Sequence, residues 1–303
     1  MIEKVDFITI IVCTYNRADI LKECLEALFS QTAPQSQYEV LVVDNNSADH
    51  TKQIVETFQA KHQNLRYYFE GEQGLSHARN AGYLNTKAKW VGYMDDDGLA
   101  HYDYIEKALA VIHNYNFDCF GGRYYAWFKY SKPRWMDAKF GQSEVKTFKT
   151  QILKDTYNDG GIIFIKTEVL KSIDGFHNLL GMNGYTIAYG EETLMQKRLR
   201  ENNYTIGYSP QIKMNHLVAK HKLKLNWHLK SSYAHGRDSI IIWNKKDKFK
   251  FHFLIQKTII LFMQGTVNLL KAFLCKGYFW ENAILDIFSP IYFLWGQYNG
   301  LKK

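Results

Sequence analysis

The strongest constraint on the fold is an alternation of apolar strands and amphipathic helices over the first third of the chain. Four runs of mostly apolar and β-branched residues predict buried strands at Phe7–Tyr15, Glu39–Val43, Leu65–Phe69 and Trp90–Met94. Apolar residues at helical spacing fill the stretches between these runs. The alternation predicts an α/β fold with a mostly parallel sheet flanked by helices on both faces.

Three consecutive aspartates, Asp95, Asp96 and Asp97, follow the fourth predicted strand. Open α/β sheets bind their ligands at the carboxyl ends of their strands. Two carboxylates about 4 Å apart repel each other by roughly 4 kcal/mol at an effective dielectric constant near 20. Three adjacent acids therefore need a solvated turn, a raised pKa or a divalent cation. A cation site and an acidic turn closed by Gly98 both fit the run when it is considered alone.

Composition narrows the class of protein. With 303 residues, 46% of them hydrophobic, the chain can bury a full core. Neither G-x-G-x-x-G nor a P-loop motif occurs, which excludes the usual dinucleotide and P-loop sites. The four cysteines are scattered and fit a reducing, cytosolic compartment. Much of the net charge of +8 lies in a lysine-rich, aromatic tail after Asn244, which favours an anionic membrane surface over nucleic acid.

The second half of the chain is less regular. The pattern predicts strands at Asp118–Tyr125, Gly160–Ile165, Thr205–Tyr208 and Ile212–Leu217, and a helix that begins with Gly190-Glu191-Glu192. We predict a catalytic domain at 1–222, made of halves 1–117 and 118–222, and a helical C-terminal region at 223–303. Thr258–Cys275 and Tyr278–Trp295 are amphipathic, and the first is too short and too polar to span a bilayer. An interfacial membrane helix and a hairpin packed on the protein both remain open.

The order of the motifs is more specific than any one of them. Along the chain stand Thr14-Tyr15-Asn16-Arg17, then Asp44, then G-L-S-H-A-R-N-A-G at 74–82, the three aspartates, the Glu191-Glu192 pair and His216 in a strand. This order resembles the inverting family-2 glycosyltransferases, which have the GT-A fold. The resemblance covers about residues 7–217. It implies transfer of a sugar from a nucleotide-sugar donor, most simply a UDP-sugar, to a glycan or lipid-linked acceptor in cell-surface polysaccharide or glycolipid assembly.

The resemblance also implies roles for particular residues. Those expected to bind the donor nucleotide are Thr14, Tyr15, Asn16, Arg17, Asp44, Arg79, Asp95 and Asp96. Asp97, with Asp95 and His216, would hold Mn²⁺ or Mg²⁺, because both ions accept hard oxygen ligands. Each role has an ordinary structural alternative. Asp44 can cap a turn, Arg79 can form a surface salt bridge, and His216 can be a histidine satisfied within a sheet.

The remaining implied roles concern the sugar and the acceptor. Glu192 would be the general base and Glu191 its positioning neighbour, although the family usually has an aspartate at the second position. Two acids at a helix start are also favoured by the helix dipole. Gly160 and Gly161 would let the chain approach the donor sugar closely. Trp127 and Trp135 belong to an aromatic stretch that would serve as an acceptor platform or as a lid.

The mode of action and the location are also predicted. The helix after the acid pair lacks the tryptophan of the Q-x-x-R-W motif of processive synthases, which predicts one sugar per encounter. The expected location is the cytosolic face of the membrane, as a peripheral protein. A sugar nucleotidyltransferase and a non-catalytic scaffold of the same fold are the alternatives. The first would have a glycine- and lysine-rich loop after the first strand, and the second would be expected to have lost its acids.

Overall fold

The structure is a computed structural model that describes residues 7–144, 146–244, 265 and 267–302. The chain folds into two compact units. The first comprises residues 1–127, 141–179 and 191–217, and the second comprises residues 128–140, 180–190 and 218–303. We describe each unit by itself.

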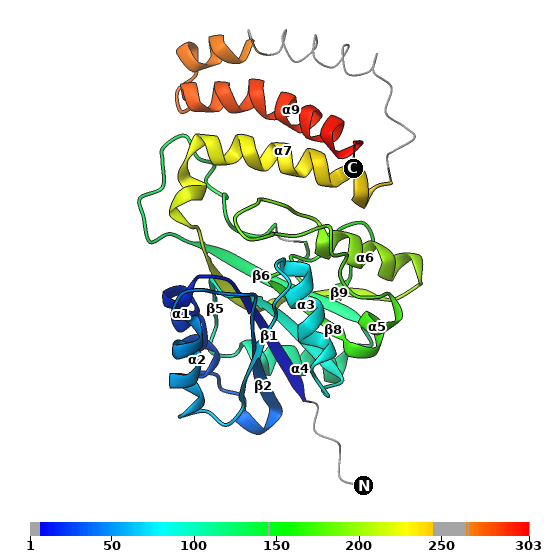
Figure 1. Cartoon of the computed structure of the whole chain (residues 1–303). Coiled ribbons are helices and arrows are strands. Elements are labelled where there is room, and N and C mark those ends of the chain that lie inside the picture. Colours follow the sequence, from blue (N-terminus) through cyan, green and yellow to red (C-terminus); the bar gives the residue numbers. More distant parts are fainter. Residues whose placement is uncertain (1–6, 145, 245–264, 266, 303) are drawn as a thin grey trace. The chain divides into compact units, whose positions relative to one another are not determined.

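The first unit is built on a single sheet (Figure 1). Its strand order is β3-β2-β1-β4-β8-β6-β9-β5, and β7 pairs with β9. The strands are β1 Ile8–Thr14, β2 Tyr38–Asp44, β3 Leu65–Phe69, β4 Trp90–Asp95, β5 Gly98–Ala100, β6 Cys119–Trp127, β7 Gln151–Ile152, β8 Ile162–Lys166 and β9 Ile206–Leu217. Its helices are α1 Ala18–Leu28, α2 Thr51–Gln59, α3 Leu75–Leu84, α4 Tyr104–Asn114, α5 Thr167–Ser172 and α6 Glu191–Glu201, with a 3-10 turn at Gln35–Gln37.

Helices cover both faces of this sheet, as the alternating pattern predicts. On one face, Ile10 of β1 belongs to a buried cluster with residues of α1, α2 and α4, including Leu25. On the other face, Ile11 packs with residues of α3, α5 and α6, including Leu199. Gly82 allows α3 to come close, because a Cβ atom there would lie 2.6 Å from Cγ2 of Ile11. A strand buried on both sides explains the continuous apolar run in the sequence.

The parallel part of the sheet brings three strand ends together. Strands β3, β2, β1 and β4 are parallel neighbours, with Thr14 opposite Asp44 and Cys13 opposite Asp95. Antiparallel pairs then attach β8 to β4 and β6 to β8. Strands β6 and β9 form a further parallel pair. The expected α/β fold is thus confirmed.

One detail of the second half differs from expectation. The two strands predicted at Thr205–Tyr208 and Ile212–Leu217 are one strand, β9. Its pairing with β6 shifts register between Gly121 and Arg123, where Pro210 lies on the opposite strand. Proline has no backbone N–H to donate, so the ladder is interrupted there although the strand continues.

The second unit contains two packed helices, α7 (Leu225–Ile242) and α9 (Trp280–Gly300). Glycine makes their close packing possible. A Cβ atom on Gly236 would collide with the backbone of Phe293, and one on Gly296 would collide with the backbone of Tyr233. Helix α9 fulfils the prediction of a helix at Tyr278–Trp295. Of the segment predicted at Thr258–Cys275, residues 258–264 and 266 lie outside the described residues, and residues 267–274 are helical. A short 3-10 turn, Lys220–Leu223, precedes α7.

Among the helices in the described part of the chain, none combines the length and the apolar character needed to cross a bilayer.

Candidate active site

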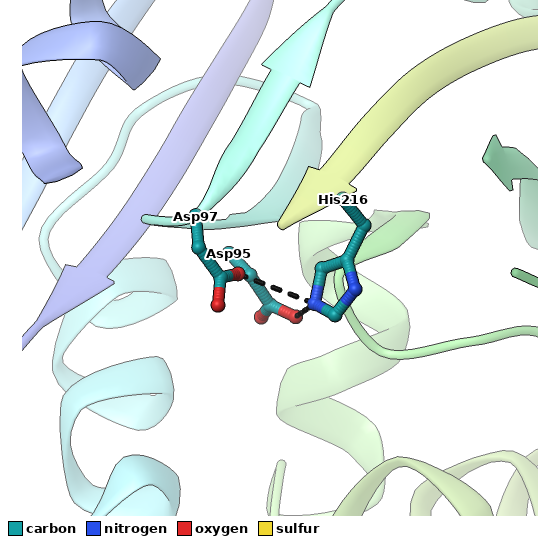
Figure 2. Close-up of side chains that lie close together, drawn as sticks. All are labelled: Asp95, Asp97 and His216. Carbon is teal, nitrogen blue, oxygen red and sulfur yellow. Dashed lines mark ion pairs between the residues drawn. The ribbon is translucent and has the colours of Figure 1, made fainter. Parts of the chain in front are cut away.

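Two aspartates and a histidine come together at the end of β4 (Figure 2). Asp95 is the last residue of β4, and Asp97 lies between β4 and β5. His216 is brought beside them by β9, because it pairs with Gly98 of β5. Its Nε2 atom lies 3.2 Å from Oδ1 of Asp97 and 3.9 Å from Oδ2 of Asp95. We call these three residues the ligand cluster.

The ligand cluster has the chemistry of a divalent cation site. One ligand atom from each side chain lies within 4.8 Å of the other two. Two carboxylates and one imidazole suit Mn²⁺, and the carboxylates also suit Mg²⁺. Asp97 is buried and Asp95 is partly exposed. The residues therefore fit a bound cation of this class.

Asp96, the middle aspartate, has different partners. Its Oδ2 atom accepts a hydrogen bond of 2.8 Å from Oγ1 of Thr14, and its Oδ1 atom lies 2.6 Å from Nη1 of Arg17. The other end of the Arg17 guanidinium lies 2.7 Å from Oδ2 of Asp97. Burial raises the pKa of Asp96 to about 6, in spite of the attraction of Arg17. Arg17 thus links Asp96 to the ligand cluster.

The expected nucleotide-binding residues gather at the ends of β1 and β2. Asp44 is buried, and its carboxylate accepts hydrogen bonds from the backbone N–H of Ser47 and from the hydroxyl of Tyr67. Asn16 has a positive φ of 51°, and its side chain accepts from the backbone N–H of Ala48. Tyr15, which directly precedes Asn16, is half-buried. The structure places these residues beside Thr14 at one edge of the sheet, and both Asp44 and Asn16 help to shape the turn after β2.

Arg79 on α3 is buried rather than on the surface. Its Nη1 atom lies 2.7 Å from Oε1 of Glu191, and its Nη2 atom lies 3.5 Å from Oδ1 of Asp95. The guanidinium also faces the rings of Tyr93 and Phe176, at 5.9 and 5.4 Å from their centroids. Burial alone would lower the pKa of Arg79, but Glu191 and Asp95 outweigh it and raise the pKa above its usual range. The Arg79 guanidinium therefore connects the ligand cluster, through Asp95, to the acid pair Glu191 and Glu192, through Glu191.

The acid pair begins α6. Glu191 is buried, whereas Glu192 is partly exposed. Burial and the charge of Glu192 raise the pKa of Glu191 to about 8, against the attraction of Arg79. The Gly160-Gly161 turn lies close by. A Cβ atom on Gly160 would lie 3.2 Å from Cβ of Glu192, and one on Gly161 would lie 2.6 Å from Cγ of Asp95. Any side chain at these glycines would crowd both acidic groups.

The two tryptophans do not share a compact unit. Trp127 ends β6 in the first unit. Trp135 belongs to the second unit, where its ring meets that of His228 edge-on at 5.2 Å and its carbonyl accepts a hydrogen bond from Asn282. Their roles toward an acceptor stay predictions.

Sequence reasoning missed two residues near the ligand cluster. The ring centroid of Tyr124 on β6 lies 5.0 Å from that of His216. Asp159 stands directly before the Gly160-Gly161 turn, and its carboxylate acts electrostatically on Tyr124. An acid next to paired glycines was a visible signal for Asp159, but no local pattern marks Tyr124.

The sheet topology and the acid-rich group at its strand ends place the protein in the α/β class, whose ligands bind at this end of the sheet. The family profile described as "Glycosyl transferase family 2" matches residues 9–173, and the chain belongs to that family. It is 27% identical over 245 residues to the glycosyltransferase AglE of Haloferax volcanii, which covers 80% of this chain and 76% of that protein. Three further curated glycosyltransferases match over 35% to 40% of this chain and over 17% to 34% of their own length.

Two solved structures share the fold. A mannosyltransferase of Pyrobaculum calidifontis, PcManGT, in complex with GDP-Man and Mn²⁺, has a TM-score of 0.59 and 18% identity, covering 97% of this chain and 72% of that one. Staphylococcus aureus TarS (residues 1–349), in complex with UDP, has a TM-score of 0.54 and 18% identity, covering 98% and 90%. The predicted family, the GT-A fold and the assignment as a glycosyltransferase are thereby confirmed.

Proposed function

We propose that the protein is a metal-dependent inverting glycosyltransferase that moves one sugar from a nucleotide-diphosphate-sugar to an acceptor hydroxyl. The observation that carries this proposal is the position of Arg79, which contacts Asp95 of the ligand cluster and also Glu191, next to Glu192. One side chain thus contacts a member of the ligand cluster and also the residue next to the proposed base. Membership of the glycosyltransferase family favours this reaction over nucleotidyl transfer.

A nucleotide sugar is the donor that the family and the fold favour. PcManGT was solved with GDP-Man, and TarS with UDP and with UDP-GlcNAc. In this chain, Asp44 and Asn16 would face the base and ribose, and the guanidinium of Arg17 would face the diphosphate. A UDP-sugar is our first expectation, since the carboxylate of Asp44 suits the imide N–H of uracil.

Asp95, Asp97 and His216 would hold Mn²⁺ or Mg²⁺ in this proposal. A divalent cation bound there supplies a Lewis acid that stabilises the negative charge of the departing diphosphate. Arg17 keeps Asp97 in place through its 2.7 Å ion pair.

Glu192 would act as the general base. Its carboxylate takes the proton of the acceptor hydroxyl as the new bond from that oxygen to C1 of the sugar forms. The bond from C1 to the phosphate oxygen breaks at the same time, and the nucleoside diphosphate leaves with the electron pair. A single displacement of this kind inverts the anomeric centre. Glu191, held by Arg79, would fix the start of α6 and so position Glu192.

The acceptor is proposed to be a glycan or a lipid-linked intermediate, met at the cytosolic face of the membrane. The support comes from helical residues 267–274 in the second unit. Several of their apolar side chains are exposed, namely Val267, Leu269, Leu270, Phe273 and Leu274. Lys271 and Lys276 lie among and beside them. Exposed apolar residues mixed with lysines suit an anionic membrane surface.

A thermal-shift experiment tests the reaction class. The protein is melted with UDP-glucose, UDP-GlcNAc and GDP-mannose, each with and without Mn²⁺. We expect a selective donor to raise the melting temperature in the presence of Mn²⁺, because ligands that bind the folded state stabilise it. Mn²⁺ alone should stabilise the wild type and Asp96→Asn, but not Asp97→Asn. Absence of any donor-dependent shift would contradict the proposal, and equal responses of the two variants would contradict the ligand assignment.

A further inference from the structure

A positively charged side chain already contacts one carboxylate oxygen of the ligand cluster. Oδ2 of Asp97 accepts a hydrogen bond of 2.7 Å from Nη2 of Arg17, while Oδ1 of the same aspartate lies 3.2 Å from Nε2 of His216. A guanidinium is always charged and has only donors, so it cannot itself be a ligand of a metal ion. Arg17 and a cation at the ligand cluster therefore compete for the carboxylate of Asp97 and repel each other.

The Arg17 side chain is the part of this arrangement that can move. Its Nη1 atom lies 2.6 Å from Oδ1 of Asp96, whose Oδ2 atom accepts a hydrogen bond of 2.8 Å from the hydroxyl of Thr14. The side chains of Asp96 and Asp97 have relative exposures of only 4% and 5%, whereas that of Arg17 is 33% exposed. The guanidinium can thus turn away from Asp97 while its contact with Asp96 remains.

The backbone of Arg17 is fixed beside the proposed nucleotide site. The backbone N–H of Asn16 donates to the hydroxyl of Ser47 at 2.9 Å, and the side-chain oxygen of Asn16 accepts from the backbone N–H of Ala48 at 2.7 Å. The carbonyl of Arg17 accepts from the backbone N–H of Leu21 at 2.9 Å, at the start of α1. Arg17 thus starts at the turn that is proposed to face the base and ribose, and its side chain ends at the ligand cluster.

Arg79 also contacts the ligand cluster, but its closer partner is Glu191. Its Nη1 atom lies 2.7 Å from Oε1 of Glu191, and its Nη2 atom lies 3.5 Å from Oδ1 of Asp95. The guanidinium of Arg17 instead lies 2.7 Å from Asp97 itself. Its charge is therefore the one that a cation bound to Asp97 has to displace. A diphosphate offers this guanidinium a replacement partner, because phosphate oxygens match its fork of donors.

We propose that Arg17 opposes binding of the cation alone and favours joint binding of the cation and the donor diphosphate, because its guanidinium passes from Asp97 to the phosphate oxygens. This inference rests on the proposed function, in which Arg17 faces the diphosphate. In the free protein, the guanidinium stabilises two neighbouring buried carboxylates. Since coupling between two ligands is reciprocal, the cation and the nucleotide each strengthen the binding of the other by the same factor.

Calorimetry separates the two effects of Arg17. Affinities are measured for Mn²⁺ alone, and for UDP and GDP in saturating Mn²⁺, with the wild type and Arg17→Gln after treatment with EDTA. We expect Arg17→Gln to bind Mn²⁺ alone about tenfold more tightly than the wild type, because a competing positive charge is gone. The same variant should bind the preferred nucleoside diphosphate about tenfold more weakly, because charged hydrogen bonds to phosphate are lost. Damage to the site would instead weaken the binding of both.

Two further variants complete the comparison. Arg66→Gln also removes one positive charge, but Arg66 pairs at 3.2 Å with Glu39, near the start of β2, whereas Asp44 ends that strand. We expect neither affinity to change in this control. Arg17→Lys keeps the charge without the fork that contacts both carboxylates. Its affinity for Mn²⁺ alone should lie between those of the wild type and Arg17→Gln, which tests the inference even if the glutamine variant does not fold.

Thermal unfolding provides a measurement that does not depend on the nucleotide. Without ligand, Arg17→Gln should melt below the wild type, because two buried carboxylates lose their positively charged partner. Mn²⁺ should then raise the melting temperature of Arg17→Gln more than that of the wild type. An unchanged or weaker affinity of Arg17→Gln for Mn²⁺ would overturn the inference and leave the proposed function intact, as long as the wild type binds a nucleotide sugar. If the wild type binds neither Mn²⁺ nor a nucleotide sugar, the proposed function fails and this inference fails with it.

Discussion

Nη1 of Arg79 lies 2.7 Å from Oε1 of Glu191, and both side chains are buried. The two residues are 112 positions apart in the chain. The same guanidinium reaches Asp95, at 3.5 Å. The guanidinium of Arg79 therefore connects helix α3 to the end of β4 and to the start of α6. A contact of this kind fixes where Glu192 stands relative to the ligand cluster.

Arg79→Met should destabilise the fold by about 2 kcal/mol, because a buried hydrogen bond to a charged group is lost. Replacing both partners by apolar residues of similar size is often close to neutral. We therefore expect Arg79→Met/Glu191→Met to regain much of the lost stability but not the transfer activity, since Glu192 is no longer positioned. Urea unfolding and transfer assays on the two single variants and the double variant test this. A double variant with wild-type activity would exclude a positioning role.

The pH dependence of stability provides an independent test of Glu191. Its pKa rises from an ordinary value of 4.5 to about 8 on folding, mainly through burial. Between these two values the folded state binds more protons than the unfolded state, so this group makes the free energy of unfolding fall as the pH rises. In Glu191→Gln, this contribution disappears. We expect a flatter profile between about pH 5 and pH 8 in urea unfolding than the wild type shows, and an unchanged slope would contradict the raised pKa.

The sequence predicted the parts of this molecule whose signal is local. Strands β1, β2 and β4 are continuous apolar runs, because both of their faces are covered. Asp95 and Asp97 were predicted to meet His216 from the order of the motifs, and the structure brings them together. The family supplied that order, since a histidine in a strand is by itself no sign of a cation site.

Contacts between residues far apart in the chain could not be predicted from the sequence. Arg79 and Glu191 each had an ordinary explanation, as a surface ion pair and as an acid favoured by a helix start. Nothing near either residue indicates the other, because the contact depends on how α3 and α6 pack on the sheet. The continuity of β9 was also missed, in this case because the local sequence pattern is misleading. Pro210 interrupts the local pattern, but pairing with β6 on both sides keeps the strand extended.

Glu192→Gln should reduce the transfer rate by roughly 10²- to 10⁴-fold, the usual contribution of a general base. Binding of the nucleotide sugar should be nearly unchanged, because the variant keeps the shape of the side chain and leaves the ligand cluster intact. Glu192→Asp is the matched control, since the family usually has an aspartate here, and it should retain much more activity than the glutamine variant. Single-turnover assays measure the rate, and calorimetry measures donor binding. An active Glu192→Gln variant would assign the base to another residue.

Membrane binding is predicted to depend on the exposed apolar residues at 267–274. Phe273 and Leu274 have relative exposures of 86% and 80%. Burying such a side chain in an apolar phase contributes about 1.5–3 kcal/mol, so Phe273→Ser should weaken binding to vesicles that contain anionic lipid by about tenfold or more. Phe148→Ser is the control, because Phe148 is 90% exposed but belongs to the first unit.

The positive charge of Lys271 provides a second test of membrane binding by the helical segment at 267–274. Lys271→Glu should weaken binding to anionic vesicles and leave the weaker binding to neutral vesicles unchanged, because a lysine near an anionic surface contributes about 1 kcal/mol. Raising the salt concentration should have the same effect as the substitution, since screening shortens the range of the attraction. Co-sedimentation across a series of lipid compositions measures both. If Phe273→Ser and Phe148→Ser sediment alike, the helical segment at 267–274 is not the membrane contact.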